Sequence, residues 1–463
     1  MIDNRLNEVL FPRSFRKDYP RAMRGEGCFL FTSEGKQYLD AAGGAAVVTI
    51  GHGVEAVGRA MAAQAQRLAY VHSSQFSNAP AAELALKLLD MAPPSFAASG
   101  RVYFTSGGSE ATETAIKLCR QFHLEAGQPR RTRIISRQQS YHGATLGALS
   151  VSGNTRRREP FAPMLSDWGQ IVPCYCYRCP LGLKHPECKL DCADDLERFL
   201  QREDPSTIAG LIFEPLSGAT LGAVAPPEGY VQRIWETCRR HGILLIADEV
   251  MTGIGRTGKN FAVQHWGVTP DMILCGKGIA SGYAALGAVL VAGHITDAIA
   301  QGSGAFLHGF TYNAHPVSAA AGLAVLDYAA KQRLFQRVEP LGRELREALA
   351  PLSQFSVVGD VRGMGLLMSI EFVNDRETRA PFPPDANIAP RIAQDLLDKG
   401  IVAYPVQGCA DGDRGDHLLL APPYVITSPI IKRLADTLVE VVSELDRTHQ
   451  AGRGGPPVLH ANS

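Results

Sequence analysis

The sequence ILLIADEVMTG at 243–253, followed by GRTG at 255–258 and MILCGKG at 272–278, decides the fold of this chain. Its first apolar run is uninterrupted, which is typical of a strand buried on both faces of a parallel sheet. That run ends at Asp248, and a second short apolar run leads to Lys277 in a turn flanked by glycines. Because ligands of open α/β sheets gather beyond the carboxyl ends of the strands, we expect this acid and this amine to reach one crevice.

A carboxylate and a lysine in one crevice suit pyridoxal phosphate. The lysine amine can hold the cofactor aldehyde as a Schiff base, while the carboxylate keeps the pyridine nitrogen protonated so that the ring draws in electrons. Taken alone, Lys277 could equally be a surface lysine and Asp248 a helix cap. The longer order, DEVMTGIGRTG at 248–258 and GKGIASG at 276–282, resembles the signature of class III (omega-type) aminotransferases, which are pyridoxal-phosphate-dependent enzymes.

This resemblance covers roughly residues 25–440 and implies the fold type I architecture of pyridoxal-phosphate-dependent transferases. We therefore expect an α/β chain with a large domain around a mostly parallel sheet and a small α+β domain formed by both chain ends. The expected divisions are an N-terminal segment with part of the small domain at 1–95, a large cofactor-binding domain at 96–335 with a cysteine-rich insert at 174–192, a C-terminal small domain at 336–448 and a disordered tail at 449–463.

The sequence TSGGS at 105–109 joins a short strand to a helix, which is an arrangement that binds anions. Free backbone N–H groups and the helix dipole both favour a phosphate at such a place, although a small-residue turn before a helix is also a common cap. The longer sequence SGGSEATE at 106–113 resembles the family's phosphate loop. The resemblance implies that Gly108 and Ser109 hold the cofactor phosphate.

Three further residues are expected around the cofactor ring. The sequence YHGAT at 141–145 resembles the family's stacking position, so Tyr141 is expected to lie against the ring, with the role of His142 left open. The resemblance places Val250 on the opposite ring face and Glu214, from a Glu-Pro pair at a strand end, near the lysine. His52 lies between glycines and is interpreted as a turn or packing residue.

The segment HGFTY at 308–312 concerns the assembly of the enzyme. Its match in the family contributes a threonine hydroxyl to the cofactor phosphate of the neighbouring subunit. The resemblance therefore implies a homodimer with shared active sites, in which Thr311 plays this role. Lys277 is the expected catalytic residue, which first carries the cofactor and then moves a proton as general base and acid.

The carboxylate site of the family is altered in this chain. Members that act on alpha-amino acids commonly have an arginine just before a Pro-Pro pair, but Leu419 stands there, and Ala219 replaces its acidic partner. We expect an amine or omega-amino donor whose reacting carbon carries no carboxylate, and a 2-oxo acid acceptor such as pyruvate or 2-oxoglutarate. The candidate cations for the acceptor, which sequence does not rank, are Arg16, Arg21, Arg24 and the run Arg156, Arg157 and Arg158.

The composition gives no support to some classes of binding protein. Lys+Arg and Asp+Glu are equal at 46 each, which gives no electrostatic case for nucleic acid or an anionic membrane. No cleavable leader or membrane-spanning run is evident, so a cytoplasmic protein is expected. The cysteine-rich insert contains His185 and a cluster formed by Cys174, Cys176, Cys179, Cys188 and Cys192. These cysteines could bind a structural zinc, remain as reduced thiols or form a disulfide. We expect no metal in the catalytic chemistry.

Two rival functions remain open at this point. A decarboxylase, a phospholyase or an aminomutase on the same scaffold would differ only in which substrate bond is aligned with the cofactor ring, which motifs do not reveal. A metal-binding protein without catalytic activity would use the cysteine cluster instead. The intact set of Lys277, Asp248 and Thr311 argues against this second rival.

Overall fold

The computed structural model describes residues 9–453 and gathers the buried strands into one seven-stranded sheet of order β4-β10-β9-β8-β7-β5-β6. β8 pairs in parallel with β7 and β9, whereas β10 runs antiparallel to β9 and β4. The expected mostly parallel sheet is confirmed. Its strands are β4 (Arg101–Thr105), β5 (Arg133–Arg137), β6 (Gln170–Ile171), β7 (Ile208–Phe213), β8 (Leu244–Asp248), β9 (Met272–Cys275) and β10 (Gly287–Val291).

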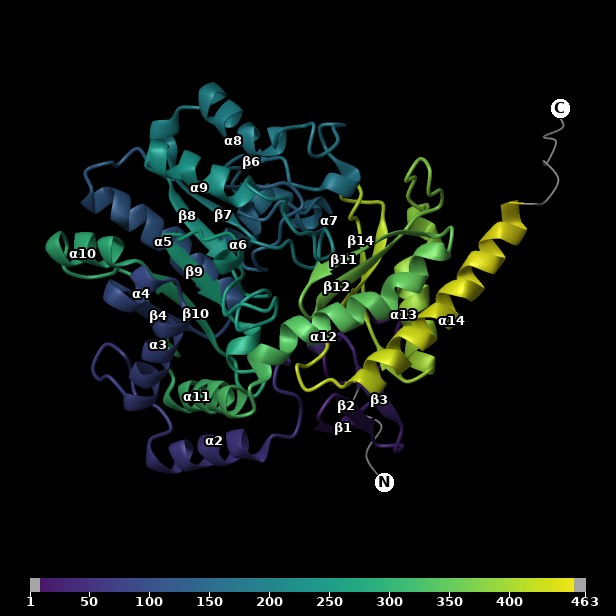
Figure 1. Cartoon of the computed structure of the whole chain (residues 1–463). Coiled ribbons are helices and arrows are strands. Elements are labelled where there is room, and N and C mark those ends of the chain that lie inside the picture. The colour runs from purple at the N-terminus through teal and green to yellow at the C-terminus, as the bar shows by residue number, and fades with distance from the viewer. Residues whose placement is uncertain (1–8, 454–463) are drawn as a thin grey trace.

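Successive side chains of the central strands pack into two separate cores. In β8, Leu245 and Ala247 belong to one core, and Leu244 and Ile246 belong to the other. Helices α5 (Gly108–Glu125) and α10 (Gly293–Gln301) cover the second face, while α8 (Asp191–Arg202) and α9 (Tyr230–His241) cover the first (Figure 1). Because side chains of a strand alternate between faces, burial of both faces explains the uninterrupted apolar run.

Two four-stranded sheets adjoin the large sheet and combine both chain ends. In the first, Ile401 of β13 pairs in parallel with Leu39 of β3, so a C-terminal strand extends an N-terminal hairpin. Figure 1 shows these purple N-terminal strands below the green and yellow C-terminal elements. The strands are β1 (Ala22–Glu26), β2 (Phe29–Thr32), β3 (Gln37–Asp40) and β13 (Ile401–Val402) in one sheet, and β11 (Val358–Met364), β12 (Leu367–Phe372), β15 (Asp416–Leu420) and β14 (Tyr404–Gln407) in the other.

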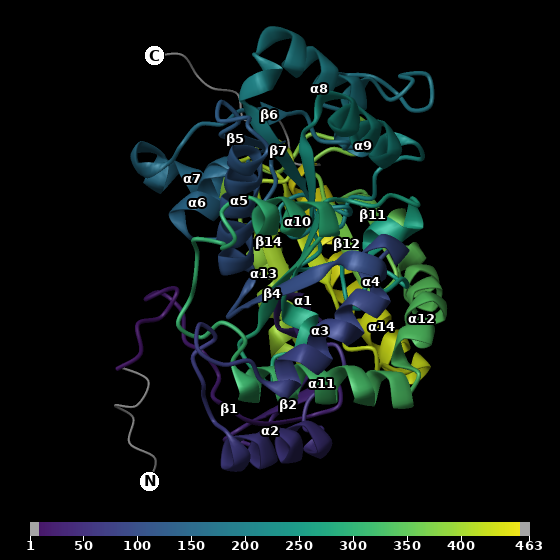
Figure 2. The same cartoon turned by 90° about the vertical axis from the view of Figure 1, so that its left-hand side faces the viewer.

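The remaining helices surround these sheets, and α2 and α11 lie side by side at the edge of the molecule in both views (Figures 1 and 2). They are α1 (Gly43–Ala46), α2 (Glu55–Arg67), α3 (Ala79–Met91), α4 (Pro94–Ser99), α6 (Leu146–Ser150), α7 (Thr155–Arg158), α11 (Pro316–Lys331), α12 (Leu334–Leu349), α13 (Ile388–Asp398) and α14 (Ser428–Arg453). Within residues 9–453, no helix combines the length and the apolar character that crossing a membrane requires.

The helix bounds bear on the expected divisions of the chain. α12 runs across the expected boundary between residues 335 and 336. The start expected for the disordered tail at residue 449 is wrong, because α14 continues to Arg453, and the rest of that tail lies outside the described residues. The other domain boundaries stay predictions.

Candidate active site

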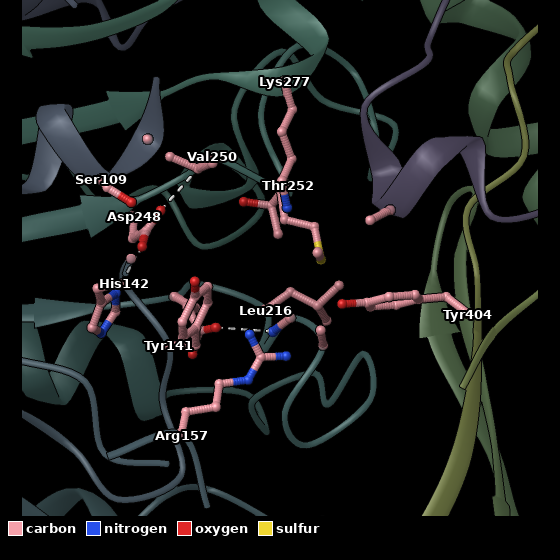
Figure 3. A pocket seen from close by; sticks show the side chains of 17 residues that line it. Ser109, Tyr141, His142, Arg157, Leu216, Asp248, Val250, Thr252, Lys277 and Tyr404 are labelled. Carbon is pink, nitrogen blue, oxygen red and sulfur yellow. Dashed lines mark hydrogen bonds and ion pairs between the residues drawn. The ribbon is translucent and has the colours of Figure 1, made fainter. Parts of the chain in front are cut away.

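A cavity of about 230 Å³ lies beyond the carboxyl ends of β8 and β9, where the sequence predicts the crevice. Its walls come from the large sheet and from Tyr404 on β14 (Figure 3). The residues predicted at the cofactor are brought together here with the exception of Thr311, and the following line the cavity: Gly108, Ser109, Tyr141, Glu214, Asp248, Val250 and Lys277.

Lys277 follows β9 and begins the short 3-10 helix η6 (Lys277–Ile279). Its φ of 42° lies in the left-handed region, which an L-residue adopts only when the surrounding structure imposes it. The side chain points into the cavity (Figure 3). Burial, which disfavours the ammonium form, lowers the pKa of Lys277 to about 8 even though Asp248 and Glu214 act in the opposite direction. Roughly a tenth of the amine is therefore unprotonated at pH 7, far more than for an ordinary lysine.

Asp248 ends β8 and is held by a buried histidine. His142 Nδ1 donates to Asp248 Oδ2 at 2.7 Å, and the main-chain N–H of Val250 donates to Asp248 Oδ1 at 3.1 Å. Both side chains are buried. The Nε2 atom of His142 finds no hydrogen-bond partner among the described residues. The sequence alone does not predict this role of His142. The one feature of the sequence that points to it is its position next to Tyr141, which follows a strand.

The N-terminus of α5 forms one end of the cavity. No side chain caps this terminus, whose N-cap residue is Gly107. Ser109 Oγ accepts a hydrogen bond from the main-chain N–H of Ala144 at 3.0 Å. A Cβ atom added to Gly108 would lie 2.9 Å from Val250 Cγ1, so glycine is needed for this close approach. An uncapped helix N-terminus with small residues offers free donors to an anion.

Glu214, just beyond β7, lies at the buried side of the cavity. Its Oε1 accepts from the main-chain N–H of Gly218 at 3.2 Å, and its Oε2 lies 3.8 Å from Arg137 Nη2. Burial raises the pKa of Glu214, although His142 and Arg137 partly counteract this effect. The carboxyl is thus held by polar partners on the protein side.

Tyr141 contacts an arginine that the sequence did not rank. The guanidinium carbon of Arg157 lies 4.3 Å from the centroid of the Tyr141 ring, and Arg157 lines the cavity. Arg16, Arg21 and Arg24 do not line it. Three adjacent arginines in one short helix point in different directions, so only the exact start of α7 determines which one faces inward.

The wall opposite the α5 terminus is largely apolar. Leu216, Ala219 and Met251 line the cavity there, and Leu419 packs with them in a common core. Only 1% of Leu419 is exposed. The position where the family commonly places an arginine is therefore occupied by a buried aliphatic side chain that contributes no charge.

Thr311 lies outside the cavity of its own chain. Its main-chain carbonyl accepts a hydrogen bond from Tyr70 Oη at 2.9 Å, in a surface loop that follows α10. The role expected for Thr311 concerns a neighbouring subunit and stays a prediction.

The cysteine-rich insert lies away from this cavity. Four of its cysteines and His185 line a separate small cavity, and Cys188 Sγ lies 4.0 Å from His185 Nδ1. All five cysteines are free thiols. In the part of the chain that the structure describes, no group of three or more His, Cys, Asp or Glu side chains is arranged to hold a metal ion.

Comparisons with known proteins show the family of this chain. The family described as "Aminotransferase class-III" matches residues 15–442. The chain is 39% identical over 447 residues to the uncharacterized aminotransferase YodT of Bacillus subtilis, which covers 96% of this chain and 99% of the relative. It is 34% identical over 437 residues to an omega-aminotransferase of Caulobacter vibrioides, with 93% and 95% covered.

Solved structures resemble the whole chain. An (S)-enantioselective omega-transaminase from Thermomicrobium roseum gives a TM-score of 0.88 at 35% identity, covering 95% of this chain and 97% of the other. An amine transaminase from an uncultivated Pseudomonas species, solved in its PLP-bound form, gives 0.87 at 35% identity, covering 95% and 98%.

The cavity itself fits pyridoxal 5'-phosphate. It offers an inward lysine amine, a buried carboxylate, an aromatic face and an uncapped helix N-terminus, which match the aldehyde, the ring nitrogen, the ring and the phosphate of that cofactor. The match with the family extends over nearly the whole length of the chain. This chain therefore belongs to the class III aminotransferases, which are enzymes that depend on pyridoxal 5'-phosphate.

Proposed function

We propose that this enzyme transfers the amino group of an amine or omega-amino compound to a 2-oxo acid such as pyruvate or 2-oxoglutarate. The observation that carries this proposal is the apolar wall formed by Leu216 and Ala219 in front of the buried Leu419. A donor with a carboxylate on its reacting carbon would need a cation at this wall, since an unpaired charge is costly against apolar groups. An aliphatic or aromatic amine gains contact with it instead.

Lys277 carries the chemistry in this proposal. Pyridoxal 5'-phosphate supplies the aldehyde that accepts the amino group and the ring that draws in electrons. The Nζ atom of Lys277 removes a proton from the reacting carbon of the donor and later delivers a proton to the reacting carbon of the acceptor. A pKa of about 8 suits an amine that must act as both base and acid near neutral pH.

The other cavity residues hold and orient the cofactor. Asp248, kept in place by His142, would hold the pyridine nitrogen, and Tyr141 and Val250 would pack against the ring. Gly108 and Ser109, at the N-terminus of α5, would supply main-chain donors to the phosphate. Glu214 places a carboxyl group near Lys277, where its charge favours the ammonium form of the amine.

A homodimer with shared active sites completes the proposal. Apolar side chains near Thr311 are exposed in the single chain, with 84% of Leu307, 66% of Phe76 and 62% of Tyr312 accessible. Tyr70 and Tyr312 pack edge to face on this surface, with ring centroids 6.1 Å apart. Exposed apolar surface of this kind favours association, and a second copy would bring Thr311 to the neighbouring cofactor phosphate.

A direct assay tests the reaction. The purified holoenzyme is mixed with butylamine and pyruvate, and we expect alanine and butanal in equal amounts by chromatography. Release of carbon dioxide from an amino acid, release of inorganic phosphate from a phosphorylated amine, or internal movement of an amino group, each without alanine formation across a panel of amines and oxo acids, would contradict the proposal. Those outcomes would assign a decarboxylase, a phospholyase or an aminomutase.

A further inference from the structure

Arg157 presents a charged group to the cavity without an acceptor for it. Its neighbours in α7 are engaged elsewhere, because Arg156 Nη1 donates to Gln407 Oε1 at 3.1 Å and Arg158 Nη1 donates to the carbonyl of Ser150 at 3.0 Å. Within residues 9–453, the guanidinium of Arg157 has no hydrogen bond and no ion pair, and it lies against the ring of Tyr141. Among these residues it is also the one guanidinium that lines the cavity.

The acidic groups of the cavity are engaged on the protein side, although in the described part of the chain Oε2 of Glu214 has only an ion-pair contact and no hydrogen bond. Asp248 accepts from His142, and Glu214 accepts from Gly218 and lies next to Arg137. Neither carboxylate forms an ion pair with Arg157. A guanidinium with free donors in a partly enclosed site binds an anion from outside strongly, because a carboxylate accepts two parallel hydrogen bonds from it.

The positions of the two basic side chains suggest which anion this is. Figure 3 shows Lys277 and Arg157 entering the cavity from opposite sides. A 2-oxo acid lying between them would turn its carbonyl carbon towards Lys277 and its carboxylate towards Arg157. The contact with Tyr141 restricts the guanidinium, so less conformational freedom is lost when the acid binds.

We propose that Arg157 binds the carboxylate of the 2-oxo acid acceptor and thereby replaces the cation that is missing at Leu419. This inference rests on the proposed function and names a specificity residue for it. The amine donor makes no use of Arg157, since its apolar group lies against Leu216 and Ala219. One cavity thus binds a donor without a carboxylate at one wall and an acceptor with a carboxylate at another.

The test compares an acceptor that has a carboxylate with one that lacks it. For Arg157→Gln, we expect kcat/KM for pyruvate to fall about 10- to 100-fold, as for loss of a charge-assisted hydrogen-bonded pair, while kcat/KM for propanal changes less than about threefold. Arg157→Lys keeps the charge without the fork and should show an intermediate loss with pyruvate. Arg156→Gln, which changes an exposed neighbour, is the matched control and should affect both acceptors by less than about twofold.

Equilibrium binding gives a second readout that does not need turnover. Calorimetry of the holoenzyme with propanoate and with propanamide should show that Arg157→Gln loses the propanoate affinity alone. If pyruvate and propanal lose activity together in Arg157→Gln, and propanoate still binds, then Arg157 only positions Tyr141 and the inference is overturned. If the wild-type enzyme aminates no oxo acid, the proposed function fails, whereas selective loss of propanoate binding would still support the carboxylate site.

Discussion

At the scale of single residues, the ionisation of Lys277 controls how the enzyme acquires its cofactor. Burial lowers the pKa of this amine to about 8, whereas an ordinary lysine titrates near 10.4. Only the unprotonated amine attacks an aldehyde. We therefore expect the rate at which the apoenzyme binds pyridoxal 5'-phosphate covalently to rise with pH, to reach half its maximum near pH 8 and to level off above it.

Stopped-flow absorbance of the apoenzyme mixed with the cofactor measures this rate, and borohydride reduction followed by peptide mapping shows which lysine is labelled. Lys277→Arg serves as the control and should give no label at residue 277 and a loss of turnover of at least about a thousandfold. A rate that still rises tenfold per pH unit between 9 and 10 would show that the environment does not activate this amine.

The candidate site was largely predictable at this scale because its residues follow strand ends. Lys277, Asp248 and Glu214 each come after a buried apolar run, and parallel strands bring their carboxyl ends to one edge. Arg157 could not be singled out, since its neighbours share its residue type and only the side-chain direction separates them. The pairing of His142 with Asp248 likewise depends on a geometry that sequence does not contain.

At the scale of elements, a buried ionic network fastens the cysteine-rich insert to the small sheet. Glu371 of β12 accepts hydrogen bonds from Arg362 of β11 at 2.7 Å and from Arg178 of the insert at 2.5 Å. Tyr175 of the insert also donates to it. Burial opposes the ionisation of Glu371, yet the two guanidinium groups keep its pKa below the ordinary value. This carboxylate therefore helps to anchor the insert, which also has hydrogen bonds with Arg379.

Removing this charge should destabilise the protein and release the insert. Glu371→Gln takes the carboxylate away from Arg178 and leaves Arg362 paired with Asp360 alone, and breaking such a buried network costs about 3 kcal/mol of unfolding free energy. Urea unfolding measures the loss, and limited trypsin digestion should cut faster after Arg178. Glu347→Gln, at an exposed position of α12, is the matched control with an expected change below about 0.5 kcal/mol. Equal stability of the two variants would contradict the anchoring role.

The thiols of the insert make a second prediction for this element. Cys176 is exposed and Cys179 and Cys188 are intermediate, whereas the other seven cysteines are buried. Burial raises the pKa of Cys192 to about 12, which keeps it as an unreactive thiol. We expect an aromatic disulfide reagent to label three thiols quickly in the native protein and ten in denaturant. Labelling that needs a chelator first, with release of zinc, would show that the cluster binds metal.

Element boundaries were less predictable than element types. The second short apolar run of the sequence forms β9 from Met272 to Cys275, because its whole length is apolar and glycine follows it. α5 starts at Gly108, inside the turn expected at 105–109, since the helix includes the last residues of that turn. α14 continues past residue 448, and the polar sequence of its last turns has no apolar periodicity from which its end could be predicted.

At the scale of the whole molecule, each complete site is expected to need residues from two chains. The cavity draws Lys277 from the large sheet and Tyr404 from the small one, yet Thr311 of the same chain lies outside it. The fold class could be predicted from the sequence because its short continuous apolar runs indicate buried strands of a parallel sheet. The subunit arrangement was implied only by family resemblance, since exposed apolar residues such as Leu307 are not distinguishable from core residues in a sequence.

Mixing two defective variants tests this arrangement. Lys277→Ala removes the reactive amine, and Thr311→Ala removes the hydroxyl expected to bind the neighbouring phosphate, so each homodimer should have little activity at limiting cofactor. If sites are shared, a mixed dimer has one intact site, which combines Lys277 from one chain with Thr311 from the other. Random exchange of subunits should then restore about a quarter of the wild-type activity, because half of the dimers are mixed and half of their sites are intact. Activity that only averages the two parents after exchange, verified by native mass spectrometry, would show that Thr311 serves no neighbouring site.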